Sequence, residues 1–347
     1  MIQNLLSIPF TDLSIIIILA ALLFLFVYLY SIWKKKLSQK HQTIKKFTIK
    51  YFLRIFGFTI LSILFIGGGM MLSNAYRTVI RTTAPAPFIV TVPDNLGFQV
   101  EEVTFLTHDG FTISGWFVPP ENGATVLLLH GYGGTRKHMI FHAKALVEGG
   151  FGILMYDERA SGQSEGDYRS YGWMDPPDVD SALNYLNSRS EVDPKNIGIG
   201  GCSIGGQISL QAASRNSQIQ AVWADGPSGI VASDYGPPTN WATAISWLSN
   251  RLLDHMLLQF LDIEKPEPMT TIIASIGPRP IMLVAGGKER SYFGAESHHV
   301  TRFYHAAGEN TQLWVIPEAT HCDGPRQRPE EYKQRLIGFF TKWLKPY

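Results

Sequence analysis

The sequence predicts an α/β domain with a mainly parallel, doubly wound sheet, preceded by an N-terminal transmembrane helical hairpin. Residues 99–347 alternate short apolar runs with helix-like stretches, the pattern of a parallel sheet with helices on both faces. Two uncharged apolar stretches precede residue 73. Charged residues make up only 17% of the 347-residue chain, against the usual quarter or so. Part of the chain is therefore expected to lie away from water.

The first apolar stretch, residues 13–33, has 21 residues and no charge. About 20 apolar residues span a bilayer core as a helix, and Tyr28, Tyr30 and Trp33 stand at one end, where aromatic side chains favour the headgroup region. A cleaved signal peptide is the alternative. Residues 1–12 contain no Lys or Arg, and the run is longer than a signal-peptide core, so we expect an uncleaved membrane helix.

The second stretch, residues 55–72, has no charge but contains a glycine triplet at 67–69. It is expected to span the membrane, with an interfacial or buried helix as the alternative. The loop between the stretches, residues 34–54, carries eight Lys or Arg and no acid, and such loops stay in the cytoplasm. We therefore expect residues 1–72 to be a two-helix, multi-pass anchor, with the remaining chain outside the cytoplasm.

A linker is expected over residues 73–98, because the segment TTAPAPF at 82–88 favours extended backbone before each proline. One domain is expected over residues 99–347. Its expected strands are 101–106, 111–118, 124–130, 151–156, 197–201, 219–224, 280–285 and 313–316, and its expected helices are 137–148, 178–188, 204–214, 296–307 and 329–344.

An amphipathic helix is expected over residues 240–261, where apolar residues recur at helical spacing. The repeating positions are Trp241, Ile245, Leu248, Leu252 and Met256. Two interpretations stay open: a small cap, at about 227–265, over a functional site, or a helix packed on the domain core.

The segment GCSIG at 201–205 fits the pattern G-x-S-x-G between an expected strand and an expected helix. This is the setting of a nucleophile elbow, which lifts a serine hydroxyl out of a sharp turn. A serine needs a base to take its proton, and an acid and then a histidine should follow along the chain. Glu289 follows the strand at 280–285 and His321 follows the strand at 313–316, so both should lie at the carboxyl edge of the sheet.

Residues 99–347 resemble the α/β-hydrolase family, through HGYGG at 130–134, DERASGQS at 157–164, the elbow, and the loops carrying Glu289 and His321. The segment from Tyr171 onward is similar to the branch with dienelactone-hydrolase-like esterases and serine peptidases. The resemblance implies that Ser203 is the nucleophile, His321 the base and Glu289 the acid. It also implies an oxyanion hole formed by the backbone N–H groups of Tyr132 and Ile204.

The family more often has Asp than Glu as the acid, so Asp225, after the strand at 219–224, is a rival acid. The family also has Gly more often than Ala at position 160. This departure concerns a turn that we expect Asp157 and Arg159 to brace, and not the chemistry.

The expected function is a membrane-anchored serine hydrolase that cleaves an ester, thioester or amide through an acyl-enzyme. A serine peptidase or aminopeptidase on the same fold is the nearest alternative, and a non-catalytic membrane-bound binding scaffold is the alternative of another class. The expected partners are the lipid bilayer, through residues 13–72, and a small-molecule or lipid-like acyl substrate, with no protein partner. The net charge of +1 gives no reason to expect nucleic acid.

No cofactor or metal is implied. His298 and His299 are adjacent on an expected helix and point about 100° apart, which does not suit one metal ion. The two cysteines, Cys202 and Cys322, each neighbour an expected catalytic residue. They can approach each other, but buried thiols are the expectation.

Overall fold

The computed structural model describes residue 30, residues 44–288 and residues 295–344. The chain divides into two compact units, Met1–Gly69 and Met70–Tyr347. Apart from residue 30, the span expected at 13–33 lies outside the described residues. The second of the two expected membrane helices is therefore the one that the structure describes.

Helix α2 runs from Ile44 to Thr83. An 18-residue window within its segment Phe56–Thr83 has a mean hydropathy of 1.8, and by length and composition this is the one helix among the described residues that can cross a membrane. The linker expected over residues 73–98 is helical in its first part, because Ala75, Val79 and Thr83 lie on one helix face and are buried. The helix ends just before Pro85, as expected of a residue that cannot continue it.

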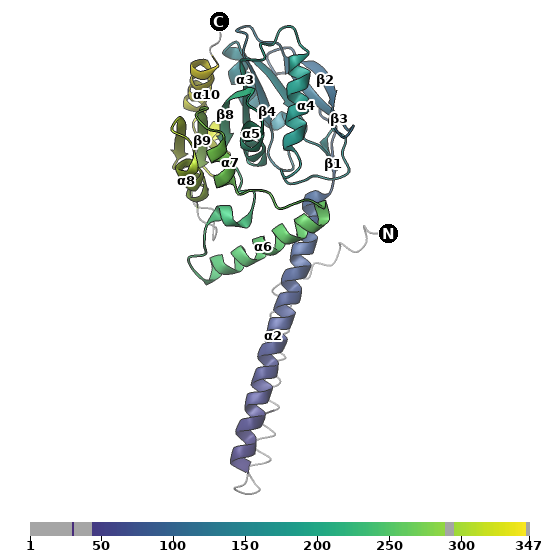
Figure 1. The fold of residues 1–347 in the computed structure, drawn as a ribbon, viewed down its shortest axis with the longest axis vertical. Coiled ribbons are helices and arrows are strands. Elements are labelled where there is room, and N and C mark those ends of the chain that lie inside the picture. The colour runs from purple at the N-terminus through teal and green to yellow at the C-terminus, as the bar shows by residue number, and fades with distance from the viewer. Residues whose placement is uncertain (1–29, 31–43, 289–294, 345–347) are drawn as a thin grey trace. The chain divides into compact units, whose positions relative to one another are not determined.

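The larger unit contains an eight-stranded sheet in the order β10-β9-β8-β7-β4-β5-β3-β2 (Figure 1). Only the β2–β3 and β3–β5 pairings are antiparallel, so the sheet is mainly parallel, as predicted. Its strands are β2 (Glu101–Leu106), β3 (Thr112–Val118), β4 (Thr125–Leu129), β5 (Gly152–Tyr156), β7 (Ile197–Cys202), β8 (Ile219–Asp225), β9 (Ile281–Gly286) and β10 (Thr311–Ile316). A separate two-residue pairing joins β1 (Ala86–Pro87) to β6 (Ser161–Gly162).

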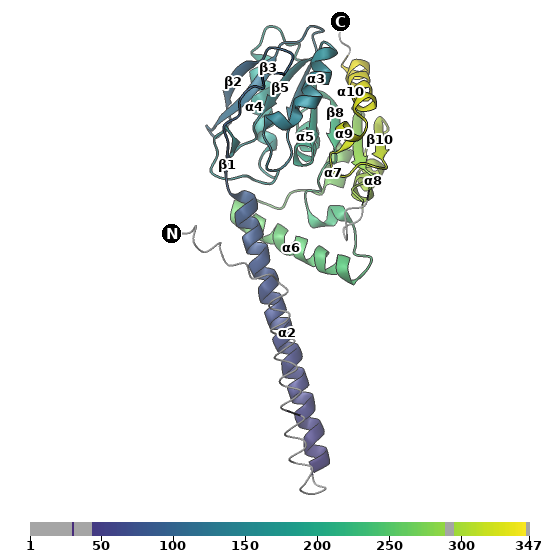
Figure 2. The same ribbon diagram turned by 180° about the vertical axis from the view of Figure 1, so that it is seen from behind.

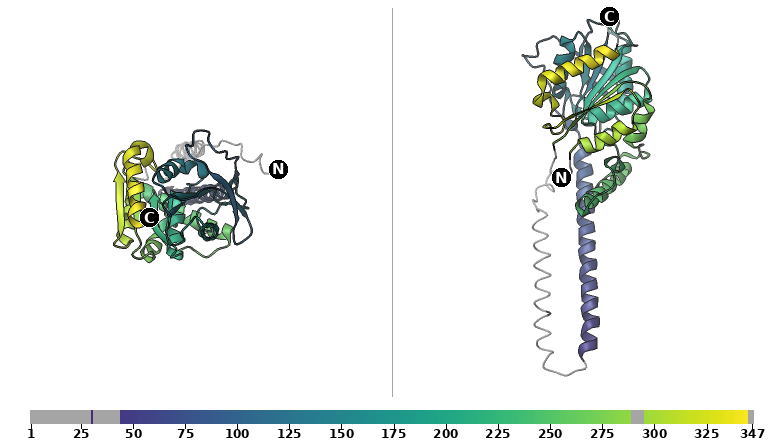
Figure 3. Two further views of the ribbon diagram at one scale, coloured as in Figure 1. Left: turned by 90° about the horizontal axis from the view of Figure 1, so that it is seen from above. Right: turned by 90° about the vertical axis from the view of Figure 1, so that its left-hand side faces the viewer.

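Helices cover both faces of the sheet, and each face has its own buried core. In β4, Leu127 and Leu129 belong to one core and Val126 and Leu128 to the other, because successive side chains of a strand point to opposite faces. The helices are α3 (Ile140–Glu148) and α10 (Pro329–Trp343) over one face, and α4 (Pro176–Asn187), α5 (Ile204–Arg215), α7 (Met269–Ser275) and α8 (Ser297–Ala306) over the other. Figures 2 and 3 show these layers from other sides.

The remaining helical elements are η2 (Arg136–Met139), η3 (Ala232–Tyr235), α6 (Trp241–Leu261) and α9 (Gly324–Gln327). Helix α6 lies outside the two layers, beyond one edge of the sheet (Figure 1). Its last turns pack on the core through Leu257 and Leu261, and the cap over residues 227–265 stays a prediction.

The turn after β5 is braced by buried ion pairs, as the sequence analysis expected. The carboxylate of Asp157 accepts hydrogen bonds from the Arg136 side chain and from the Arg136 backbone N–H, the latter at 2.7 Å. The guanidinium of Arg159 donates to Asp178 at 2.5 and 2.6 Å. Ala160 has φ 55°, the left-handed conformation for which the family more often has glycine.

Candidate active site

Ser203 occupies the sharp turn between β7 and α5. Its φ of 59° is strained for a residue with a side chain. A Cβ on Gly205 would overlap the carbonyl oxygen of Leu129, and one on Gly201 would overlap Gly205. The two glycines of the motif therefore let α5 pack directly against the sheet, and this packing holds the serine hydroxyl at the carboxyl edge.

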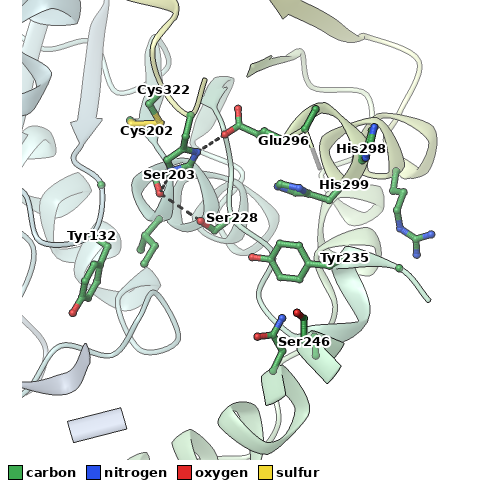
Figure 4. A pocket seen from close by; sticks show the side chains of 18 of the residues that line it. Tyr132, Cys202, Ser203, Ser228, Tyr235, Ser246, Glu296, His298, His299 and Cys322 are labelled. Atoms are coloured by element: carbon green, nitrogen blue, oxygen red, sulfur yellow. Dashed lines mark hydrogen bonds and ion pairs between the residues drawn. A yellow bond between two sulfur atoms is a disulfide. The ribbon is translucent and has the colours of Figure 1, made fainter. Parts of the chain in front are cut away.

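His321 lies on the loop after β10, as the sequence analysis predicted. Its Nε2 is 2.7 Å from the Ser203 hydroxyl oxygen. The other ring nitrogen, Nδ1, donates a hydrogen bond to Oε2 of Glu296. The histidine is thus held with Nε2 free to accept the serine proton (Figure 4).

Glu296 stands directly before α8, on the same β9–α8 connection where the sequence analysis placed the acid. Its side chain is 3% exposed and reaches back over the ends of two strands. Its second oxygen, Oε1, accepts the Gly286 backbone N–H at 2.9 Å. A Cβ on Gly226, where φ is 55°, would lie 2.9 Å from both carboxylate oxygens, so a glycine at the end of β8 makes room for this acid.

Neither acid named from the sequence contacts His321 in the described structure. Glu289 lies in the segment 289–294, outside the described residues, and the position beside Nδ1 is filled by Glu296. Asp225 points elsewhere, because it accepts the Tyr332 hydroxyl at 2.9 Å. Burial, and then the charge of Glu296, raise the pKa of Asp225 to about 7.

The sequence analysis did not name Glu296 as a candidate acid. Its position in the sequence could have indicated this role, because Glu296 is a long acidic side chain at the start of the helix that follows β9. It also missed Ser228, whose hydroxyl oxygen lies 3.5 Å from that of Ser203, and Tyr235, which lines the same cavity.

Two backbone N–H groups are available beside the serine hydroxyl. Within the part of the chain that the structure describes, neither the N–H of Tyr132 nor that of Ile204 donates to a protein acceptor. Ile204 is the first residue of α5, where the helix dipole favours negative charge. A Cβ on the neighbouring Gly131 would lie 3.2 Å from the Ser203 Cβ, so the two loops approach closely. These are the groups that the sequence analysis named for an oxyanion hole.

A disulfide joins Cys202 to Cys322, where the sequence analysis expected buried thiols. Cys202 precedes Ser203 and Cys322 follows His321, so the bond connects the two loops that carry the hydroxyl and the imidazole, 120 residues apart in sequence. Figure 4 shows it beside Ser203. The sequence analysis allowed the two cysteines to approach each other, but the expectation of buried thiols was wrong, because the spacing of the two loops is set only in the folded chain.

A cavity of about 1270 Å³ opens in front of Ser203 and His321. Ile204, Tyr171 and Tyr235 line it, together with polar residues of α6. Among these is Ser246, which lies across the cavity from Ser203 (Figure 4). Among the described residues that line it, the only carboxylate is Glu296, which His321 already engages. The lining also includes Arg302 and Arg326, so the cavity combines apolar and polar side chains with two cationic groups.

One group of side chains among the described residues is close enough to hold a metal ion: His108, Asp109 and Asp178. It lies outside the cavity lining. The Arg159 guanidinium already binds both aspartates, with Asp109 at 3.0 Å. A cation there would have to displace a buried arginine, which does not fit a resident metal.

Fold and site together define an esterase- or peptidase-like α/β hydrolase. The chain belongs to the prolyl oligopeptidase family, whose model matches residues 137–346, more than half of the chain.

Three individual proteins illustrate what this chain is similar to. The esterase Pf2001 of Pyrococcus furiosus superposes with a TM-score of 0.61 at 25% identity, covering 76% of this chain and 98% of the esterase. The acylaminoacyl peptidase of Pyrococcus horikoshii shares the fold with a TM-score of 0.55 at 18% identity, covering 74% of this chain but 44% of the peptidase. The Escherichia coli K12 protein YfhR is 28% identical over 258 residues, 72% of this chain and 83% of YfhR.

The first prediction separates the three candidate acids. Glu296→Gln is expected to lower kcat on a p-nitrophenyl ester by about 10⁴-fold or somewhat less, because the acid orients the imidazole and stabilises its charged form. Glu289→Gln and Asp225→Asn, the matched controls, are expected to stay near wild type. A crippled Asp225→Asn or Glu289→Gln beside a nearly normal Glu296→Gln would show that another carboxylate acts on His321.

The second prediction concerns the disulfide. Because the chain has two cysteines, a reductant has one target. Reduction is expected to lower kcat by about 10- to 100-fold, since small misplacements of catalytic groups have effects of this size. The Cys202→Ser/Cys322→Ser double variant should be equally slow and indifferent to reductant. Unchanged kcat after reduction, with free thiols verified by mass tagging, would contradict a role in alignment.

Proposed function

We propose that this protein is a membrane-anchored serine hydrolase that cleaves a carboxylic ester with an apolar acyl group. The observation that carries the proposal is the continuous hydrogen-bonded series from the Ser203 hydroxyl through His321 to Glu296. A binding scaffold has no need for a serine in a strained turn with an oriented imidazole beside it. The series therefore favours catalysis over a non-catalytic role.

In the proposed reaction, Nε2 of His321 takes the hydroxyl proton while the Ser203 oxygen attacks the substrate carbonyl carbon. The Tyr132 and Ile204 N–H groups stabilise the negative carbonyl oxygen of the tetrahedral intermediate. His321 then gives the proton to the leaving alcohol, and an acyl-enzyme forms on Ser203. Water, deprotonated by His321, attacks the acyl carbon and releases the acid and the free serine. Glu296 keeps the ring in the required tautomer and stabilises it when charged.

A peptidase is the second candidate, and the family match supports it. An aminopeptidase must bind the charged amino terminus of a peptide, for which a carboxylate is the usual partner. The described cavity lining offers none beyond Glu296. Ester substrates need no such partner, and the similar esterase is covered over nearly its full length. We therefore favour an ester.

The proposed anchor is α2, with the hydrolase domain outside the cytoplasm. The basic residues of 34–54 lie before the apolar segment and the hydrolase domain lies after it, so one crossing places them on opposite sides, with the basic side in the cytoplasm. The Cys202–Cys322 disulfide supports the same side, because disulfides persist in oxidising compartments. The first span, at 13–33, remains a prediction.

The third prediction tests the nucleophile. Ser203→Ala is expected to abolish labelling by a fluorophosphonate and to lower kcat by roughly 10⁶-fold, as removal of a catalytic serine does. Ser228→Ala, which removes the neighbouring hydroxyl, is the matched control and should still label. Wild-type protein that does not label, or a Ser203→Ala variant that labels normally, would remove the hydrolase assignment. Faster turnover of aminoacyl anilides than of p-nitrophenyl esters would favour the peptidase.

The fourth prediction concerns topology. A phosphatase reporter that works only outside the cytoplasm, fused after Tyr347, is expected to be active, and a reporter that works only inside is expected to be silent. The physical reason is that translocating the basic loop at 34–54 against the membrane potential and away from anionic lipid is unfavourable. The opposite pattern would place the hydrolase domain in the cytoplasm and contradict the proposed side.

A further inference from the structure

The first half of helix α6 carries three large apolar residues on the side that faces away from the protein. Trp241, Ile245 and Leu248 are 79%, 56% and 54% exposed, and their spacing of four and three residues puts them on one helix face. Thr243, Ser246 and Asn250, on the opposite face, line the cavity. A helix that only covers a soluble domain has the reverse arrangement, so the outward apolar face requires an explanation beyond folding.

The orientation of α6 is held by specific contacts. Its first turn is capped by Asn240, whose side chain accepts the Thr243 backbone N–H at 2.9 Å. The Asp254 carboxylate accepts the Ala232 N–H at 2.8 Å, and Leu257 and Leu261 are buried. The second half of the helix is therefore fixed to the domain, and the exposed apolar face of the first half follows from that attachment.

The short distance along the chain between the proposed membrane helix and the hydrolase domain indicates that lipid covers this apolar face. The uncharged stretch ends at Leu72, and Ala75, three residues later, is already buried in the larger unit. Three helical residues span about 4.5 Å, so a chain anchored by α2 holds the hydrolase domain directly at the membrane surface. Phe88 and Ile89, shortly after α2, are also 68% and 79% exposed, as suits a surface that meets lipid.

We propose that α6 lies in the membrane interface, with Trp241, Ile245 and Leu248 inserted among the lipids, and that its other face forms a wall of the active-site cavity. Tryptophan favours the headgroup boundary, and aliphatic residues beside it favour the acyl chains. A lipid-borne ester then passes from the bilayer around α6 to Ser203. This deepens the proposed function, on which it rests, by naming the substrate class as membrane-dissolved acyl lipids.

The contact is tested with the full chain reconstituted in phosphatidylcholine vesicles. Ile245→Cys and Leu248→Cys are labelled with an NBD maleimide, which leaves the joined native cysteines unreacted. Both labels are expected to be quenched by phosphatidylcholine brominated in its upper acyl chain. Lys195→Cys, exposed before β7 at the opposite edge of the sheet, is the control and should not be quenched. The proposal is overturned if the labels at 245 and 248 behave like the control. It is also overturned if their NBD emission shifts to the blue without bromolipid quenching, which is the result expected for contact with a second protein copy.

The route of the substrate is tested with the triple variant Trp241→Ser/Ile245→Ser/Leu248→Ser. Its kcat/KM for a long-chain ester dissolved in vesicles is expected to fall about tenfold or more, because apolar contacts with lipid are lost. Its kcat/KM for water-soluble p-nitrophenyl butyrate should not change. Equal rates on the vesicle-borne ester overturn the entry route. If wild type cleaves neither ester, the proposed function fails, while the quenching result still decides the membrane contact.

Discussion

The tight turn at Ser203 is the constraint on which the rest of the site depends. The backbone at this serine is strained, and Gly201 and Gly205 allow the approach of α5 to the sheet that maintains it. Strain of this kind persists only where surrounding packing over-determines it. Here the packing comes from two fully buried cores, one on each face of the sheet. These cores therefore stabilise the fold and also fix the position of the Ser203 hydroxyl. The other groups of the site are arranged around this hydroxyl.

The other groups reach that hydroxyl because parallel strands end at a common edge. Loops after β7, β9 and β10 supply Ser203, Glu296 and His321 from widely separated parts of the chain. The edge also brings a second buried acid close, since Asp225 ends β8. Tyr332 engages that carboxyl, and burial raises its pKa. The two acids are thus kept in separate hydrogen-bonding environments, and of these two it is Glu296 that is hydrogen-bonded to the imidazole.

The disulfide and α6 connect the site to its proposed surroundings. The covalent link between Cys202 and Cys322 joins the loop of Ser203 to the loop of His321 and keeps the two side chains aligned. A disulfide also fits the proposed position of the domain outside the cytoplasm. The first half of helix α6 lines the cavity with Thr243, Ser246 and Asn250 beside Trp247, and it turns Trp241, Ile245 and Leu248 to the outside. In a chain anchored beside a bilayer, this arrangement suits hydrolysis of substrates that dissolve in lipid.

The sequence by itself determined the class of fold, most of its strands and helices, the nucleophile candidate, its histidine partner and the two N–H groups. These features are local: apolar runs, the G-x-S-x-G turn and residues placed at strand ends. The length of α2 past residue 73, the disulfide and the identity of the acid were decided by tertiary structure. Burial of Ala75 and Val79 against the domain extends the helix. Convergence of two loops joins Cys202 to Cys322. Glu296 contacts His321 because the space at Gly226 admits its long side chain and the Gly286 N–H binds its second oxygen. No sequence pattern records the distance between loops that meet only in the folded chain.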